Sequence, residues 1–571
     1  MCGIIGYVGL DDAKKELLKG LQALEYRGYD SAGIAYCQPN GIKTIKTVGK
    51  VSCLKDKVAK EAADDVTTCG IGHTRWATHG KPSDENSHPH RSSSGRFAVV
   101  HNGIIENYAV LKKELQDKGV TFLSETDTEV IAHLIEQAYT GDFTAAVRAA
   151  IARLEGSYAL GVLCAEHPDE IVAVRRSSPL IVGLSEEGNF IASDIPAVLA
   201  HTRRILQLAD GEVVCLTRDG ARVLDEGGRP VEKKEMLVDW DVTSAEKGGH
   251  AHFMIKEILE QPAALAATVS PRVGADGGIV LDGIRLTAAQ LRKIRRIAIL
   301  ACGSAYHAGV VGKYVLEKLT RIPVDVDVAS EFRYRDPIVD ANTLAIVISQ
   351  SGETADTLAA MREAKRRGAR VLSIVNVVGS SIAAESDDVL YTWAGPEISV
   401  ATTKAYSTQL VMLYLLAFYI AHKLGHIDDR DQRRLLSALI RLPDLVAGIL
   451  RQAPQLQQLA QRYAYLEHAY FIGRNLDYAV ALEASLKLKE ISYIHSEAYP
   501  AGELKHGTIS LIEEGTFVVA LACSDKLTEK TMSNIKEVKA RGAEVLVVTT
   551  DDNREVLPEA DHVIYIPKTN D

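Results

Sequence analysis

Residues 344–375 read LAIVISQSGETADTLAAMREAKRRGARVLSIV, and their pattern decides the fold of the second half of the chain. The apolar run 345–348 predicts a strand, a Ser/Gly-rich turn follows, and the helical pattern 354–367 leads to a second strand at 371–375. Strands that are apolar at nearly every position are typical of a parallel sheet with helices on both faces. This stretch therefore predicts an α/β domain with αβα layers.

The same pattern recurs 174 residues later, with strands expected at 517–521 and 545–549 and a helix at 527–541. We expect two related αβα lobes, joined by a helical region over residues 401–465. Because strand–helix units are common, chance similarity between two of them is the alternative.

The residues before these lobes have a different character. Residues 1 to about 240 combine short expected strands (96–100, 159–164, 212–216) with expected helices at 109–118 and 129–140, which predicts a layered α+β domain. We place this domain at residues 2–240, a linker at 241–293, the first lobe at 294–440 and the second at 460–571. Within the linker, we expect a helix over 253–260 that ends before Pro262.

Composition excludes several classes of protein. The chain has 571 residues and a formal net charge of −10, so a broad basic surface for nucleic acid or anionic lipid is not expected. The eight cysteines are scattered without a CxxC pair, which favours a reducing compartment. Asp11 and Asp12 interrupt any signal peptide, and the longest apolar run, 410–421, is too short to span a bilayer and predicts a buried helix. We expect a cytoplasmic protein.

The N-terminus carries a candidate nucleophile. The chain begins Met1-Cys2-Gly3, and removal of Met1 would place a thiol and a free α-amine on one residue. An α-amine with a pKa near ~8 can accept the thiol proton, directly or through water. The structural alternative is a small apolar residue at the start of a strand.

Four motifs follow downstream: Glu25–Gly33, Gly72–Gly80, His101–Asn107 and Thr126–Glu129. They resemble the class II glutamine amidotransferase family, whose fold is the N-terminal-nucleophile αββα sandwich. The resemblance implies that Cys2 attacks the glutamine side chain, that Asn102 and Gly103 bind the oxyanion, and that Trp76 caps the site and gates ammonia passage. It also implies that Arg75, His79 and Asp127 bind glutamine, with Arg75 on its α-carboxylate and Asp127 on its α-ammonium.

Several histidines lie close together in this domain, but we do not expect a metal site. The histidines have no accompanying thiol or carboxylate pattern, and loop histidines are more often solvated or bonded to backbone than metal ligands. The same reasoning applies to two histidines of the linker. The set is His73, His79, His88, His90, His101, His250 and His252.

A hydroxyl-rich turn follows the strand at 344–348. Ser349, Gln350, Ser351 and Thr354 precede a helix, whose N-terminal N–H groups and dipole would favour a phosphate. A simple helix cap is the structural alternative. The turn containing Ser304 would lie at the same carboxyl edge of the sheet, whereas the second lobe has Asp525 in its corresponding turn, so we expect one phosphate site.

In the second lobe, Glu483, Lys487 and Glu490 are spaced to share one helix face. Such a row is usually a solvated salt-bridge stripe. Here it belongs to a set of motifs that resembles the sugar-isomerase lobes of the glucosamine-6-phosphate synthase family. The resemblance implies that Glu490 moves a proton between C1 and C2 of fructose 6-phosphate, that His506 assists ring opening, and that Glu483 and Lys487 line the pocket. It implies further sugar-phosphate contacts from Ser304, Ser349, Gln350, Ser351, Thr354, Val400 and Ala401.

The resemblance implies a glutamine-dependent enzyme that makes glucosamine 6-phosphate and glutamate, without a metal or organic cofactor, as a homodimer. Family members continue to a tail whose lysine forms an imine with the sugar, and this sequence ends at Asp571. The expectation is that glutaminase chemistry is retained while the synthase half lacks that lysine. Two alternatives remain: a class II amidotransferase with another acceptor, and a sugar-phosphate-binding sensor without turnover.

Overall fold

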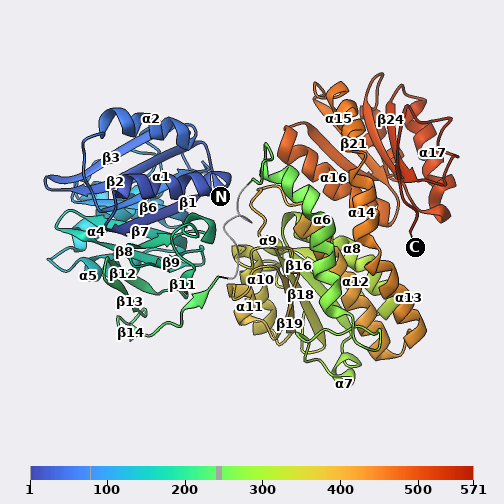
Figure 1. The fold of residues 1–571 in the computed structure, drawn as a ribbon, viewed down its shortest axis with the longest axis horizontal. Helices are drawn as coiled ribbons and strands as arrows, with labels where there is room; N and C mark the ends of the chain where they lie inside the picture. Colours follow the sequence, from blue (N-terminus) through green and yellow to red (C-terminus); the bar gives the residue numbers. More distant parts are fainter. Residues whose placement is uncertain (1, 78, 239–246, 570–571) are drawn as a thin grey trace. The chain divides into compact units, whose positions relative to one another are not determined.

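The computed structural model describes residues 2–77, 79–238 and 247–569, and Figure 1 shows its elements. The chain divides into two compact units, Met1–Glu246 and Lys247–Asp571. Each unit is described by itself below.

The first sheet of the N-terminal unit is antiparallel, with the strand order β15-β11-β9-β10-β1-β4-β2-β3. Strand β1 lies between β10 and β4, and it is buried along its whole length. The described strands are β1 (Gly3–Gly9), β2 (Ser31–Gln38), β3 (Gly41–Val48), β4 (Cys69–Arg75), β9 (Ile181–Leu184), β10 (Gly188–Ala192), β11 (Arg204–Gln207) and β15 (Met236–Leu237).

The second sheet of this unit is also antiparallel, with the order β14-β13-β12-β8-β7-β6-β5. The expected strands at 96–100, 159–164 and 212–216 are confirmed as parts of β6, β7 and β12. The described strands are β5 (His90–Arg91), β6 (Phe97–Ile105), β7 (Gly156–Cys164), β8 (His167–Arg176), β12 (Val213–Thr217), β13 (Gly220–Leu224) and β14 (Pro230–Val231).

Three apolar layers hold this unit together. Ile4 and Ile71 of the first sheet meet Val100 and Leu163 of the second in a buried core between the sheets. Helices α1 (Ala13–Leu24) and α2 (Val51–Glu61) cover the outer face of the first sheet. The outer face of the second is covered by α3 (Tyr108–Asp117), α4 (Glu129–Ala138) and α5 (Phe143–Ile151). The expected αββα sandwich is therefore confirmed.

The first lobe of the C-terminal unit is built on a parallel sheet with the order β17-β16-β18-β19-β20. Helices α6, α8 and α12 pack on one face around a fully buried core, and α9, α10 and α11 pack on the other. The strands are β16 (Arg296–Ala301), β17 (Val324–Val328), β18 (Thr343–Ser349), β19 (Arg370–Val375) and β20 (Asp388–Tyr391). The helices are α6 (Phe253–Val269), α8 (Gly303–Thr320), α9 (Ala329–Phe332), α10 (Ala355–Arg366), α11 (Ser381–Glu385) and α12 (Lys404–Leu424).

Helix α6 corrects one expectation, because it continues through Pro262 to Val269 instead of ending before the proline. A proline removes the N–H that would bond the carbonyl of Ile258. The Gln261 side chain replaces that donor, since its Nε2 lies 3.1 Å from the Ile258 oxygen. Leu265 and Val269, beyond the proline, then join the core of the first lobe. Residues 241–246 of the expected linker lie outside the described residues.

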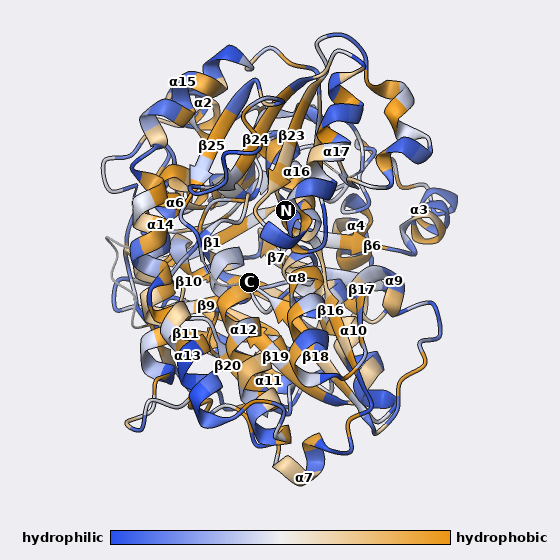
Figure 2. Ribbon diagram, turned by 90° about the vertical axis from the view of Figure 1, so that its right-hand side faces the viewer, coloured by the Kyte–Doolittle hydropathy of each residue, from blue (hydrophilic) through white to orange (hydrophobic). Residues whose placement is uncertain are grey.

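The second lobe repeats the topology of the first, with the parallel order β22-β21-β23-β24-β25. Helix α16 (Leu476–Ser492) packs on one face and α17 (Thr528–Lys539) on the other. Its strands are β21 (His468–Gly473), β22 (His495–Pro500), β23 (Phe517–Ala522), β24 (Glu544–Thr550) and β25 (His562–Ile566). Figure 2 shows that β23 and β24 are mainly hydrophobic. The two expected αβα lobes are confirmed.

The helical connection between the lobes is also confirmed. It consists of α12, α13 (Asp429–Ile440), α14 (Leu442–Leu450) and α15 (Ala453–Arg462). Helix α12 is long and apolar enough to cross a membrane, but 67% of its apolar stretch is buried within the fold. It packs against α6 and α8, so it is a core helix, as the run at 410–421 predicted.

Candidate active sites

Cys2 directly precedes β1, and its thiol lies beside the C-terminal end of β4. Its Sγ is 3.3 Å from the backbone nitrogen of Trp76, which donates to it. The Cys2 carbonyl accepts hydrogen bonds from Arg27 Nε at 3.0 Å and Asn102 Nδ2 at 3.1 Å. Burial raises the pKa of the Cys2 thiol, and the Trp76 N–H and the charges of Arg75 and Arg27 oppose that increase only in part. The thiol therefore needs a base for activation.

A cavity in front of the thiol is lined by most of the predicted glutaminase residues. Asn102 is not among the lining residues, but its amide contacts the Cys2 backbone. The structure therefore brings the predicted glutaminase residues together. The Trp76 ring is partly exposed and packs edge-on against Tyr29, with centroids 5.3 Å apart. The lining residues are Cys2, Arg75, Trp76, His79, His88, His101, Gly103, Thr126, Asp127 and Thr128.

Two opposite charges face this cavity. The Nη2 of Arg75 donates to the carbonyls of His79 and Gly80, whereas its buried Nη1 has no hydrogen-bond partner among the described residues. Asp127 is 5% exposed, and its Oδ2 accepts from the backbone nitrogen of Ile105 at 2.8 Å. A free amino acid carries a carboxylate and an ammonium group that match these two charges.

Gly103 occupies a position that only glycine fits. Its φ is +132°, and an added Cβ would lie 2.0 Å from the carbonyl oxygen of Ser157 on the neighbouring strand. β6 and β7 can therefore approach closely at this point, where Gly103 lines the cavity.

Four of the histidines that were expected in loops, solvated or bonded to backbone, are buried behind the cavity. His73 of β4 and His101 of β6 come together with His88 because the two sheets stack on each other. These three side chains and that of His90 are almost fully buried, and burial lowers the pKa of each, to about 3 for His73. They are therefore neutral at physiological pH.

The predicted phosphate-binding turn lies between β18 and α10. Ser349 Oγ accepts from the Gly352 N–H at 3.0 Å and lies 3.0 Å from Thr354 Oγ1, and Ser351 Oγ accepts from the Glu353 N–H at 3.2 Å. Gly352 has a φ of +66°, and Thr354 is the N-cap residue of α10 without a side-chain cap bond. The turn thus gathers three hydroxyls at a helix N-terminus.

A polar cluster joins the two lobes at the facing helices α8 and α16. Glu483 accepts from Ser304 Oγ at 2.7 Å, and its other oxygen lies 2.8 Å from His307 Nδ1. Lys487 Nζ donates to Ser304 Oγ at 3.0 Å and also binds Glu490. Glu483 and Lys487 therefore form an inter-lobe network, whereas Glu490 is exposed at its edge and contacts Lys487 of its own helix. His307, 176 residues from Glu483, was missed.

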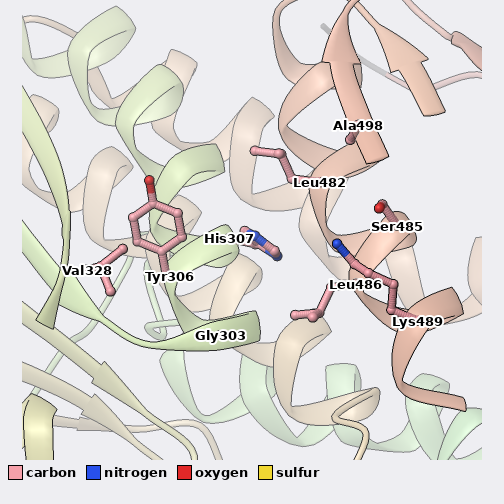
Figure 3. A pocket seen from close by; sticks show the side chains of 9 residues that line it. All are labelled: Gly303, Tyr306, His307, Val328, Leu482, Ser485, Leu486, Lys489 and Ala498. Atoms are coloured by element: carbon pink, nitrogen blue, oxygen red, sulfur yellow. The ribbon is translucent and has the colours of Figure 1, made fainter. Parts of the chain in front are cut away.

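Beside this cluster lies a cavity of about 330 Å³ between the same helices. Figure 3 shows His307 projecting from α8 toward α16 between the two lobes. The cavity is lined by Gly303, Tyr306, His307, Val328, Leu482, Ser485, Leu486, Lys489 and Ala498.

Other predicted sugar-site residues are more dispersed. Val400 is exposed and Ala401 is buried in the segment between β20 and α12. His506 is exposed in the short helix Leu504–His506, and among the described residues it makes no side-chain hydrogen bond to Glu490. Gln350 is half-buried, and its backbone carbonyl accepts a hydrogen bond from the backbone N–H of Asn376 at 3.1 Å.

Comparisons with known proteins cover both units. A family model described as a glutamine amidotransferase domain matches residues 73–200, and one described as a SIS domain matches residues 290–419 and 465–571. A glutamine–fructose-6-phosphate aminotransferase (isomerizing) from Caldanaerobacter subterraneus subsp. tengcongensis is 57% identical over 569 residues, which covers 100% of this chain and 93% of the relative. One from Thermus thermophilus is 51% identical over 570 residues, with the same coverage.

Among solved structures, the C-terminal domain of glucosamine-fructose-6-phosphate aminotransferase from Francisella tularensis resembles the second unit. The TM-score is 0.54 at 40% identity, and the match covers 57% of this chain and 92% of that one.

Proposed function

The chain belongs to the isomerizing glutamine–fructose-6-phosphate aminotransferase family, and from that premise we propose that it releases ammonia from glutamine at Cys2 and transfers it to fructose 6-phosphate. The products are glutamate and glucosamine 6-phosphate. The enzyme is a transferase with a glutaminase domain and two sugar-isomerase lobes.

In the glutaminase half, the Cys2 thiolate attacks the side-chain amide carbon of glutamine. The α-amine that removal of Met1 exposes takes the thiol proton, directly or through water. The Asn102 amide and the Gly103 N–H donate to the oxyanion. The proton held by the α-amine passes to the amide nitrogen, so ammonia leaves as the thioester forms. Water then hydrolyses the thioester to glutamate.

Selection of free glutamine rests on the two charges across the cavity. The unpaired Nη1 of Arg75 binds the α-carboxylate, and Asp127 binds the α-ammonium group. His79 contributes through its carbonyl, which holds the Arg75 guanidinium in place. The partly exposed Trp76 ring covers the cavity and excludes water.

The sugar phosphate binds at the turn of the first lobe. Ser349, Ser351 and Thr354 present hydroxyls beside the N-terminus of α10, and the adjacent Gln350 adds its amide. In the equivalent turn of the second lobe, the Cys523 N–H donates to the carboxylate of Asp477 at 3.0 Å. This carboxylate would repel an external anion at the turn, which supports a single phosphate site.

The inter-lobe cluster performs the isomerisation. Ammonia condenses with the C2 ketone of the opened sugar with loss of water, and movement of a proton from C1 to C2 then gives the 2-amino aldose. Glu490 carries that proton, Lys487 holds Glu490 in place, and Glu483 with Ser304 contacts the sugar. His506 assists ring opening, and Val400 and Ala401 border the sugar. His307 belongs to this group because it binds Glu483.

The observation that carries the glutaminase assignment is the convergence of Cys2, Asn102, Gly103, Arg75 and Asp127 from separate strands and loops around one cavity. The test is to incubate the protein with glutamine and fructose 6-phosphate and to measure glutamate and glucosamine 6-phosphate separately. Cys2→Ala should abolish glutamate formation. Persistence of glutamate in that variant would exclude the thiol as nucleophile.

The same assay separates the alternatives. Glutamate without amino sugar indicates a glutaminase, or an amidotransferase with another acceptor. Sugar-phosphate binding without either product indicates a sensor.

We further propose a cytoplasmic location and a homodimer. All eight cysteines are free thiols, which suits a reducing compartment. The dimer rests on the family resemblance, and light scattering of the purified protein would test it.

A further inference from the structure

The proton on the His73 imidazole can be assigned from its neighbours. Its Nε2 lies 3.0 Å from the backbone carbonyl oxygen of His101 and 3.0 Å from Oδ1 of Asn102. A backbone carbonyl can only accept a hydrogen bond. Nε2 must therefore carry the hydrogen, which it shares between these two acceptors.

This assignment fixes the orientation of the Asn102 amide. The Asn102 atom that faces the His73 N–H must be the oxygen, because an amide NH₂ there would place two donors against each other in a buried site. Nδ2 then lies on the Cys2 side, 3.1 Å from the Cys2 carbonyl oxygen. Since Nδ2 has two hydrogens, one can bind this carbonyl while the second remains for an oxyanion.

The surroundings hold His73 in this single state. Its side chain is fully buried in β4, and its Nδ1 has no hydrogen-bond partner among the described residues. The ring stacks on His88, with centroids 4.1 Å apart and an angle of 18° between the planes. His88 is itself fixed, because its Nδ1 accepts from the His101 N–H at 3.3 Å.

Thr128 connects these neutral histidines to the Asp127 carboxylate. Thr128 Oγ1 lies 2.8 Å from His101 Nδ1, 3.4 Å from His88 Nε2 and 3.4 Å from Asp127 Oδ1. The histidines therefore support the cavity from behind without adding a charge of their own.

We propose that His73 is a positioning residue, which fixes the amide of Asn102 with its N–H groups toward the reacting centre. This proposal rests on the oxyanion role given above to Asn102. Without the His73 N–H, the amide is free to turn over and present its oxygen to the developing negative charge. Binding of glutamine is not affected, because Arg75 and Asp127 hold its other end.

The test compares two amides at position 73. In His73→Gln the side-chain nitrogen reaches the place of Nε2, whereas in His73→Asn it reaches only the place of Nδ1. Loss of one oxyanion donor costs roughly 100- to 1000-fold in kcat. We expect glutaminase kcat to fall at least about 10-fold in His73→Asn, to stay within about threefold in His73→Gln, and KM for glutamine to change little in either.

Two further measurements exclude a general structural effect. Alkylation of Cys2 by iodoacetamide needs no oxyanion donor, so its rate should be equal in the two variants. In the Asn102→Ala background, His73→Asn should cause no additional loss of kcat.

Equal kcat values in the two His73 variants, alkylation that slows together with kcat, or additive losses with Asn102→Ala would each overturn the proposal. A separate outcome concerns the proposed function itself. If Asn102→Ala alone keeps the kcat of the wild type, the oxyanion role of Asn102 is wrong.

Discussion

The replacement of Gly103 by alanine tests how closely β6 and β7 must approach. The residue has a φ of +132°, which costs a non-glycine residue about 1–3 kcal/mol. The new Cβ would also lie 2.0 Å from the Ser157 carbonyl oxygen, whereas real Cβ contacts are essentially never below 3.0 Å. Because the obstacle is backbone, the two strands must separate locally by about 1 Å.

A movement of this size decides the outcome for catalysis. An oxyanion donor acts within a window of about 2.7–3.1 Å, so a displacement of about 1 Å removes the Gly103 N–H from its working distance. We expect glutaminase kcat to fall about 100- to 1000-fold with little change in KM, and the N-terminal unit to lose at least about 3 kcal/mol of stability. Steady-state glutamate release and urea unfolding would measure the two effects.

Gly141→Ala is the matched control. Gly141 also has a positive φ, +108°, but an added Cβ there meets no atom within 4 Å. This variant should lose only about 1–2 kcal/mol of stability and keep the kcat of the wild type. If Gly103→Ala retains kcat within about threefold of the wild type, the inference from the close approach of the strands is wrong.

Three other predictions concern charge and phosphate. Burial raises the pKa of Glu257 to about 7 from an ordinary value of 4.5, so its ionisation opposes folding as pH rises between these values. As pH rises from 5 to 8, the free energy of unfolding of Glu257→Gln should therefore increase by up to about 3 kcal/mol relative to that of the wild type, as measured by urea unfolding. A difference independent of pH would contradict this. The four buried histidines of the glutaminase unit have lowered pKa values, so they bind protons only on unfolding. That unit should lose about 1 kcal/mol per histidine between pH 6.5 and pH 5.5, and a flat stability profile over this range would refute the assignment. Finally, Ser349→Ala combined with Ser351→Ala should weaken fructose 6-phosphate binding at least about 10-fold in calorimetry and leave glutaminase activity unchanged. Ser524→Ala in the second lobe should not change the affinity. Equal affinities of the wild type, the double variant and Ser524→Ala would exclude the turn as the phosphate site.

Local sequence signals predicted most of the fold. The alternation of apolar runs and helical patterns located the central strands and flanking helices of both lobes, because strands such as β18 and β23 are buried on both faces. The exception at Pro262 has a local cause, the Gln261 side chain that bonds the Ile258 carbonyl. Side-chain replacement of a lost backbone bond cannot be read from helix propensity.

The candidate sites were predicted less completely, because their missing members depend on tertiary packing. His307 meets Glu483 only when α8 and α16 face each other across the lobes. His73, His88 and His101 were recognised only as neighbouring loop histidines, and they form one buried cluster only after two sheets stack. The signal in the sequence that these histidines are buried was the absence of a clear polar face on β4 and β6.

The Asp477 carboxylate beneath the second-lobe turn also bears on how such two-lobed enzymes can arise. When an ancestral domain is copied, both copies inherit an anion slot. Here one copy supplies its own negative charge to that slot, with Cys523 as the donor. In the proposed mechanism, the neighbouring helix α16 carries the acid–base residue Glu490. A carboxylate built into one of two repeated turns would thus restrict anion binding to the other lobe.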